Sequence, residues 1–313
     1  MAQSPTHKFG QIIGDLLEEA MKARLEEVAR EYGFYLDYKH TRTARGRKKK
    51  VAWLDNNCNC HDLDFVFEKD GSDERIGSPK AFIEIAWRRY TKHSRNKVQE
   101  IQGAIIPLVA RYHDCCPFLG VVLAGEFTEG AIAQLRSIGF RVLHYHYESI
   151  VCAFETVGVD ARFGEDTPDE TVQGKVDDYN RLKSSDRNTL IEALQGIQSS
   201  DLDSFCQSIR RTFDRQISCI QVTPLHGDSH ELCSVEEAVS FIRSYREEGS
   251  TSTFVRYELR VTYTNGDKVE GSFRDKDAAV EFLACVACPP ACLRAGQCVR
   301  RQVARKRVGP ASA

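Results

Sequence analysis

Two acidic residues in the N-terminal half stand where the sequence is otherwise apolar. Asp64 directly precedes the run FVF, and Glu84 lies in the middle of AFIEIAW, twenty residues further on. A carboxylate inside such a run is costly to bury unless a partner compensates its charge. Two carboxylates on adjacent strands can converge on one point, where they would form an oxygen site suited to Mg²⁺.

A metal ion held there would support phosphate-ester chemistry. It would polarise a phosphate, lower the pKa of an attacking water and neutralise the developing charge. The main-chain carbonyl of Ile85 and water molecules would complete its shell, and Mn²⁺ would be a substitute metal. Asp62, which we expect on the same strand face as Asp64, is the alternative first acid. We prefer Asp64 because it directly precedes the apolar run.

The elements around these acids alternate between helix and strand. Apolar spacings of three and four residues predict helices, and short apolar or aromatic runs predict strands. The order is a helix at 8–32, strands at 34–38, 51–54, 63–67 and 81–87, a helix at 94–112, a strand at 118–124, a helix at 128–138, a strand at 140–145 and a helical stretch to 154. We therefore expect an α/β fold, a compact mixed sheet with helices on both faces, over residues 1–155.

The remainder of the chain predicts three further parts. Residues 156–228 read as a charged linker and a helical segment, with helix expected over 187–218. Residues 229–288 predict a small α+β unit in which a helix, a hairpin turning at Asn265-Gly266 and a second helix follow one another. We expect residues 289–313 to form a basic flexible tail.

The order of elements over residues 8–154, together with Asp64 and Glu84, resembles the PD-(D/E)XK nuclease superfamily. The resemblance implies a restriction-endonuclease-like core and a Mg²⁺-dependent endodeoxyribonuclease of the restriction or phage-defence type. It also implies that an acid on the first helix can approach the metal, and we expect Glu19 in that role. The family motif places a lysine two residues after the second acid, but this sequence has Ala86 there.

A displaced lysine would have to take over the role of the missing one. Lys97, on the first turns of the next helix, is the first choice because its position flanks the apolar stripe that faces the sheet. Lys92 in the preceding turn is the second choice. Arg88 shares the strand face of Glu84, but a guanidinium cannot act as a base.

A basic stretch, KHTRTARGRKKK at 39–50, predicts contacts with a nucleic-acid backbone. The alternative is a solvated loop. If the loop binds DNA, two further arginines would line the same side. The expected contact residues are Arg45, Arg47, Lys48, Lys49, Lys50, Arg88 and Arg89.

Bulk properties narrow the class of protein. No apolar run reaches the roughly 20 residues that a membrane span needs, and no signal peptide is visible, so we expect a cytoplasmic protein. We do not expect structural zinc at Cys285, Cys288, Cys292 and Cys298, because zinc sites usually separate two ligand pairs by a longer stretch.

Two alternatives to an active nuclease remain open. Ala86 leaves room for a catalytically inactive DNA-binding or regulatory protein on the same fold. The C-terminal unit leaves room for an interaction protein that binds a protein partner. Cleavage of both strands would favour a homodimer.

Overall fold

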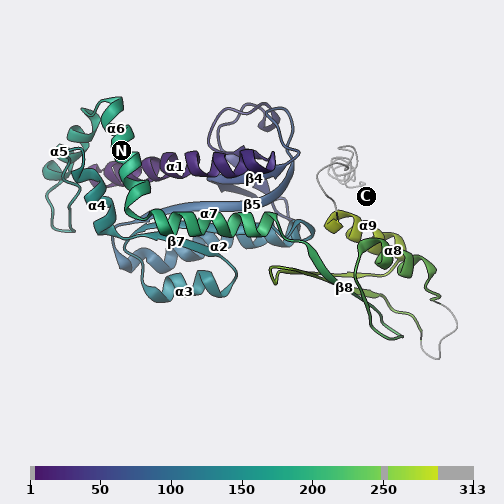
Figure 1. Ribbon diagram of the computed structural model, residues 1–313. Helices are drawn as coiled ribbons and strands as arrows, with labels where there is room; N and C mark the ends of the chain where they lie inside the picture. Colours follow the sequence, from purple (N-terminus) through teal and green to yellow (C-terminus); the bar gives the residue numbers. More distant parts are fainter. Residues whose placement is uncertain (1–3, 248–252, 288–313) are drawn as a thin grey trace, which may run out of the picture.

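The computed structural model describes residues 4–247 and 253–287, and Figure 1 shows how the elements are arranged. The helices are α1 (Pro5–Tyr32), α2 (Ser94–Arg111), α3 (Glu129–Ser137), α4 (Tyr147–Glu155), α5 (Asp169–Asn180), α6 (Ser184–Ile197), α7 (Ser199–Phe213), α8 (Val235–Ser244) and α9 (Lys276–Ala287). The strands are β1 (Tyr35–Asp37), β2 (Val51–Leu54), β3 (Cys60–Leu63), β4 (Phe65–Lys69), β5 (Ser78–Arg88), β6 (Phe118–Gly125), β7 (Arg141–Tyr145), β8 (Ile217–Pro224), β9 (His230–Leu232), β10 (Tyr257–Tyr263) and β11 (Lys268–Phe273).

A five-stranded mixed sheet forms the centre of the N-terminal part. Its order is β1-β4-β5-β6-β7. β4 pairs antiparallel with β1 and with β5, whereas β6 pairs parallel with β5 and with β7. The expected α/β class, a mixed sheet flanked by helices, is confirmed.

Helix α1 covers one face of this sheet (Figure 1). Ser4 caps its start by accepting a hydrogen bond from the N–H of His7, and Gly33 ends it in the left-handed conformation, φ 64°. One stripe of the helix is buried against the sheet, including Ile13, Leu17 and Leu25. Each such side chain stabilises the fold by about 1.5–3 kcal/mol relative to exposure. Residues of α4, α6 and α7 complete the same core.

A second apolar core lies on the opposite face of the sheet. Helices α2 and α3 pack there, together with the two-stranded sheet of β2 and β3. Side chains alternate along β5, so Phe82 and Ala86 point into this second core while Ile83 points into the first. Glu84 has the same parity as Phe82 and Ala86, which directs it toward α2.

The chain bends at Asp64, so the single strand expected over 63–67 is interrupted there. β3 ends at Leu63 and pairs with β2, whereas β4 begins at Phe65 and pairs with β5. Asp62 therefore belongs to a different sheet from the strand that follows Asp64, and the expectation that the two acids share one strand face is wrong. The cause is the change of pairing partner at Asp64.

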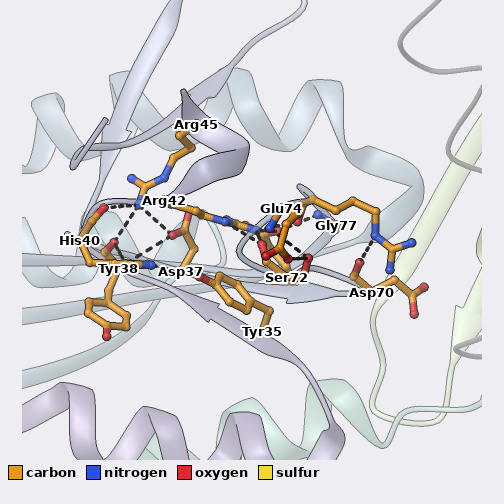
Figure 2. Close-up of polar contacts among 12 residues, drawn as sticks. Tyr35, Asp37, Tyr38, His40, Arg42, Arg45, Asp70, Ser72, Glu74 and Gly77 are labelled. Carbon is orange, nitrogen blue, oxygen red and sulfur yellow. Dashed lines mark hydrogen bonds and ion pairs between the residues drawn. The ribbon is translucent and has the colours of Figure 1, made fainter. Parts of the chain in front are cut away.

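A buried ionic cluster ties the loop after β1 to β4 (Figure 2). Arg42 is fully buried, and its guanidinium donates to both carboxylate oxygens of Glu68, at 2.6 and 2.9 Å. It also lies 2.8 Å from the carboxylate of Asp37. The remaining donors bond to the main-chain carbonyls of Ser72 and Arg75. The arginine thus compensates the charge of the two buried acids away from water, although neither oxygen of Asp37 accepts a hydrogen bond from the described residues.

Arg45 extends this cluster, and it was expected on the DNA side. Its side chain is only 5% exposed and lies 3.1 Å from the carboxylate of Asp37. It donates to the carbonyls of Tyr38 and His40 (Figure 2). It also donates to the carbonyl of Lys49. The expectation that Arg45 contacts DNA is wrong, because its guanidinium is used to hold the loop together.

Beyond α4, the chain forms a helical segment and then a second sheet. The four-stranded antiparallel sheet has the order β11-β10-β8-β9 and carries α8 and α9 on one face (Figure 1). Ile217 and Ser218, expected at the end of a helix, lie in β8, because alternation along this strand buries Ile220 and Val222. β8 thus joins the unit expected at 229–288. Of the four cysteines considered for zinc, Cys285 lies in α9. The other three, Cys288, Cys292 and Cys298, lie outside the described residues, as does the tail expected at 289–313.

Within the described ranges, no helix combines the length and the apolar character that crossing a bilayer requires.

We predict that Arg42→Met lowers the free energy of unfolding by about 3–5 kcal/mol, because it leaves Asp37 and Glu68 buried with too little positive charge. Equilibrium urea unfolding measures the loss. Arg47→Met is the control, since Arg47 is an exposed residue of the same loop and its replacement should cost no more than about 0.5 kcal/mol. Equal stability of the two variants would contradict the role assigned to Arg42.

Candidate active site

Asp64 and Glu84 lie side by side where β4 leaves β5. The last residue pair between these strands is Phe65 with Ile83, so the next residues on each strand are the two acids. Asp64 accepts a hydrogen bond from the main-chain N–H of Ile85 at 2.6 Å. The main-chain N–H of Asp64 acts on Glu84 by lowering the pKa of its carboxyl group. The hydrogen bond from Ile85 holds the Asp64 side chain in place beside Glu84.

Burial of the pair raises the pKa of both acids. Glu84 is only 8% exposed, and burial followed by the charge of Asp64 raises the pKa of Glu84 well above its ordinary value. Burial also raises the pKa of Asp64, although the N–H of Ile85 and the ammonium of Lys97 oppose this shift. Among the described residues, nothing donates a hydrogen bond to the buried Oε1 of Glu84. An unpaired buried carboxylate oxygen is costly, and a cation would satisfy it.

Lys97 is the cation of α2 that faces this pair. Its charge lowers the pKa of both Asp64 and Glu84, and its side chain is 21% exposed. Its Nζ lies 3.3 Å from Oε2 of Glu100, one turn further along α2. Glu100 also pairs with the guanidinium of Arg88, whose nitrogen lies 3.4 Å from the same carboxylate oxygen. Glu100 therefore links Lys97 on the helix to Arg88 at the end of β5.

Ala86 occupies a position where a lysine would be buried. It is 2% exposed and belongs to the same apolar core as Val98, the residue after Lys97. A small side chain at this position therefore packs with α2, while the neighbouring Lys97 brings a positive charge to the acids. Lys92 does not take part in this arrangement, because it forms an ion pair with Glu165 and is more than half exposed.

Glu18 of α1 lies within the electrostatic reach of Asp64. Burial and then the charge of Asp64 raise the pKa of Glu18 to about 7. The expected Glu19 is exposed one residue further along the helix, and its charge acts on Tyr179 on α5. Glu18 was not singled out from the sequence, because both residues lie at the margin of the apolar stripe.

A hollow of about 240 Å³ opens beside Asp64, between α1 and the chain after β1. It contains four acidic and two basic side chains. The lining residues are Asp15, Glu18, Glu19, Lys22, Tyr38, Lys39, Asp64 and Phe65. Lys39 was not singled out from the sequence, because nothing in the basic run distinguishes it from its neighbours.

The donors at Asp64 and Glu84 fit a hard divalent cation. No group of three or more His, Cys, Asp or Glu side chains that could hold a metal ion occurs in the described part of the chain. Mg²⁺ is commonly bound through only one or two carboxylates, with water in its other positions. The carbonyl of Ile85 faces the same side of β5 as its N–H, which bonds to Asp64. Two carboxylates, one of them with an unpaired oxygen, and this carbonyl make a suitable donor set.

The other expected site residues lie further out. Asp62 is exposed and lies 2.5 Å from Lys50. Arg89 is anchored within the fold, because it donates to the carbonyl of Phe163 at 2.7 Å and stacks over Tyr147. Four of the residues that were expected to contact DNA are exposed on the loop: Arg47, Lys48, Lys49 and Lys50.

Comparisons with known proteins show no family to which this chain belongs. No family model matches it, and no curated protein matches it. A crystal structure described as that of a protein of unknown function, AF1548, aligns with 63% of this chain and 97% of its own, at 12% identity and a TM-score of 0.26. A similarity of this size carries no conclusion about fold or function.

We predict that the metal-free protein loses stability as the pH rises through neutrality. The pKa of Glu18 in the folded state, about 7, lies above its ordinary value of 4.5, so its protonated form favours folding. This contribution is complete below the unfolded pKa and is lost as the pH rises through the folded one. Urea unfolding in EDTA between about pH 5 and about pH 8 should show the decline, and Glu18→Gln should flatten it.

Glu19→Gln is the matched control for this experiment, since Glu19 is the exposed neighbour on the same helix. It should keep the pH dependence of the unaltered protein. If Glu18→Gln shows the same decline as Glu19→Gln, the buried acid cluster does not govern stability in this pH range.

Proposed function

We propose that this chain is a Mg²⁺-dependent nuclease of the PD-(D/E)XK type that hydrolyses phosphodiester bonds in DNA. The observation that carries the proposal is the adjacent pair of Asp64 and Glu84. Asp64 accepts a hydrogen bond from the N–H of Ile85, Glu84 is buried with an unpaired oxygen, and the charge of Lys97 acts on both acids. The order of elements also supports it. A helix, antiparallel strands, a helix, a parallel strand and a further helix and strand are the arrangement of the restriction-endonuclease-like core.

Asp64, Glu84 and the carbonyl of Ile85 would hold the metal ion. When bound, the ion supplies Lewis-acid chemistry, polarising the scissile phosphate and lowering the pKa of the attacking water. The carboxylate of Asp64 is already fixed by the N–H of Ile85, so little conformational freedom of this side chain is lost when it binds the cation. A bound cation would also offset the repulsion between the two acids, whose pKa values burial raises.

Lys97 would assist the attacking water in place of the family's motif lysine. Its ammonium reaches the acids from α2, while Ala86 is packed in the core. Its ion pair with Glu100 limits its range of positions. A cation held near the water can orient it and stabilise negative charge as the phosphorus–oxygen bond forms.

The exposed cations around the site would bind the DNA backbone. Arg47, Lys48, Lys49 and Lys50 remain on the surface of the loop, and Arg88 lies half-buried at the end of β5. Contacts of this kind position a duplex without reading its sequence.

An inactive DNA-binding protein on the same fold is the second candidate function. Ala86 is the observation that favours it, because the motif lysine is absent. Supercoiled plasmid with Mg²⁺ or Mn²⁺ separates the two functions, since only an active nuclease nicks it. A gel shift in EDTA tests for DNA binding without cleavage.

We predict that Asp64→Asn and Glu84→Gln each abolish Mg²⁺-dependent plasmid nicking. Both changes keep the shape of the side chain but remove the charge that binds the cation. The metal-free protein should stay as stable or become more stable, because a buried pair of like charges is relieved. Plasmid nicking and urea unfolding measure the two effects.

Asp62→Asn is the matched control for this pair, because Asp62 is an exposed acid on β3. Its activity should equal that of the unaltered protein. Full activity in Asp64→Asn or in Glu84→Gln would rule out the assigned site, and loss confined to Asp62→Asn would move the first acid to β3.

We predict that Lys97→Ala lowers the nicking rate by about 10²-fold, the effect of a positioned acid–base group. Lys92→Ala should have little effect, because Lys92 is paired with Glu165. Metal affinity, measured by calorimetry with Mn²⁺, should change little in either variant. Full activity of Lys97→Ala would refute its role. If the unaltered protein is inactive and Ala86→Lys restores nicking, the inactive-protein alternative is correct.

A further inference from the structure

Lys39 lies at the entrance of the hollow beside Asp64. It lines this hollow together with Glu18 and Asp64, and its charge lowers the pKa of both of these acids. Its side chain is 63% exposed, and its Nζ lies 3.7 Å from the carboxylate of Asp15, which is also exposed. A solvent-exposed pair of this kind contributes little free energy. Lys39 can therefore exchange Asp15 for another anion at low cost.

The main chain on both sides of Lys39 is held from within the protein. One guanidinium nitrogen of Arg45 donates to the carbonyl of Tyr38 at 3.2 Å and to the carbonyl of His40 at 2.8 Å (Figure 2). The imidazole of His40 lies 2.8 Å from the same Tyr38 carbonyl. The residues before and after Lys39 are thus fixed, while Lys39 itself points out of this network.

The buried ionic cluster anchors this clamp to the sheet. Arg45 and Arg42 both pair with Asp37, two residues before Lys39, and Arg42 pairs in turn with Glu68 of β4. Burying two guanidinium groups carries a large desolvation cost, which their ion pairs with Asp37 and Glu68 partly offset. These ion pairs hold the segment that carries Lys39.

We propose that Lys39 binds a phosphate of the DNA strand next to the one that is cleaved. This inference rests on the proposed nuclease function. A fixed main chain lowers the entropy lost when the ammonium binds an anion. Lys39 stands on the α1 side of the acids, whereas Lys97 reaches them from α2. The two lysines would therefore meet the strand from opposite sides of the scissile phosphate.

The charges of the hollow make this contact depend on a divalent cation. Acidic side chains outnumber Lys22 and Lys39 there, so a phosphate is repelled while the carboxylates carry no metal. A cation bound by Asp64 and Glu84 removes part of this negative charge, so the repulsion of a phosphate near Lys39 becomes weaker. Lys39 should then contribute to DNA affinity in Ca²⁺ but much less in EDTA.

The test compares DNA binding by the full chain and by Lys39→Ala, using fluorescence anisotropy of a labelled duplex in Ca²⁺ and in EDTA. In Ca²⁺, Lys39→Ala should bind at least about tenfold more weakly, the effect of one charge-assisted hydrogen bond. The slope of log affinity against log salt should fall by about 0.9 for the lost phosphate contact. Lys39→Arg should retain most of the affinity. Lys8→Ala, an exposed lysine near the start of α1, should leave affinity unchanged.

A calorimetric titration with Ca²⁺ in the absence of DNA separates this role from a structural one. Removing a positive charge near the acids should leave Ca²⁺ affinity equal or higher in Lys39→Ala, whereas a misfolded site would bind Ca²⁺ more weakly. Unchanged DNA affinity of Lys39→Ala in Ca²⁺, with the unaltered protein cleaving plasmid, would overturn the inference and leave the nuclease function standing. A protein that neither cleaves nor binds DNA would overturn both.

Discussion

The burial of two carboxylates side by side is the constraint on which the rest of this structure depends. Asp64 and Glu84 stand where β4 separates from β5, and Asp64 is held by the main-chain N–H of Ile85. Burial raises the pKa of both acids, and the charge of Asp64 raises that of Glu84 further. Such an arrangement persists only if the surrounding fold is stable enough to hold it, and it favours any process that neutralises the pair.

The two faces of the sheet supply different charges to this point. α1 packs on one face and contributes Glu18, whereas α2 packs on the other and contributes Lys97. Asp64 and Glu84 lie just beyond the last residue pair of β4 and β5, and charges from both faces of the sheet act on them there.

A second buried ionic cluster, around Arg42 (Figure 2), holds the loop that carries Lys39. It differs from the acidic pair because its charges compensate one another: Arg42 and Arg45 face Asp37 and Glu68. The first cluster places two carboxylates of like charge side by side, whereas the second places carboxylates beside guanidinium groups. One arrangement suits binding and chemistry, and the other suits the rigid placement of the loop that carries Lys39.

The sequence by itself determined the alternation of helices and strands and the placement of Asp64 and Glu84 near adjacent strands, since a carboxylate in an apolar run leaves a local signal. It also pointed to Lys97, through the helical position next to the buried stripe. Only the tertiary structure decided that the charge of Asp64 acts on Glu18, that Asp62 belongs to another sheet, and that Arg45 is buried while Lys39 reaches the hollow. The physical reason is that burial and pairing within a basic run or at the margin of a helix depend on the segments packed against it, and these contacts join residues far apart in the chain.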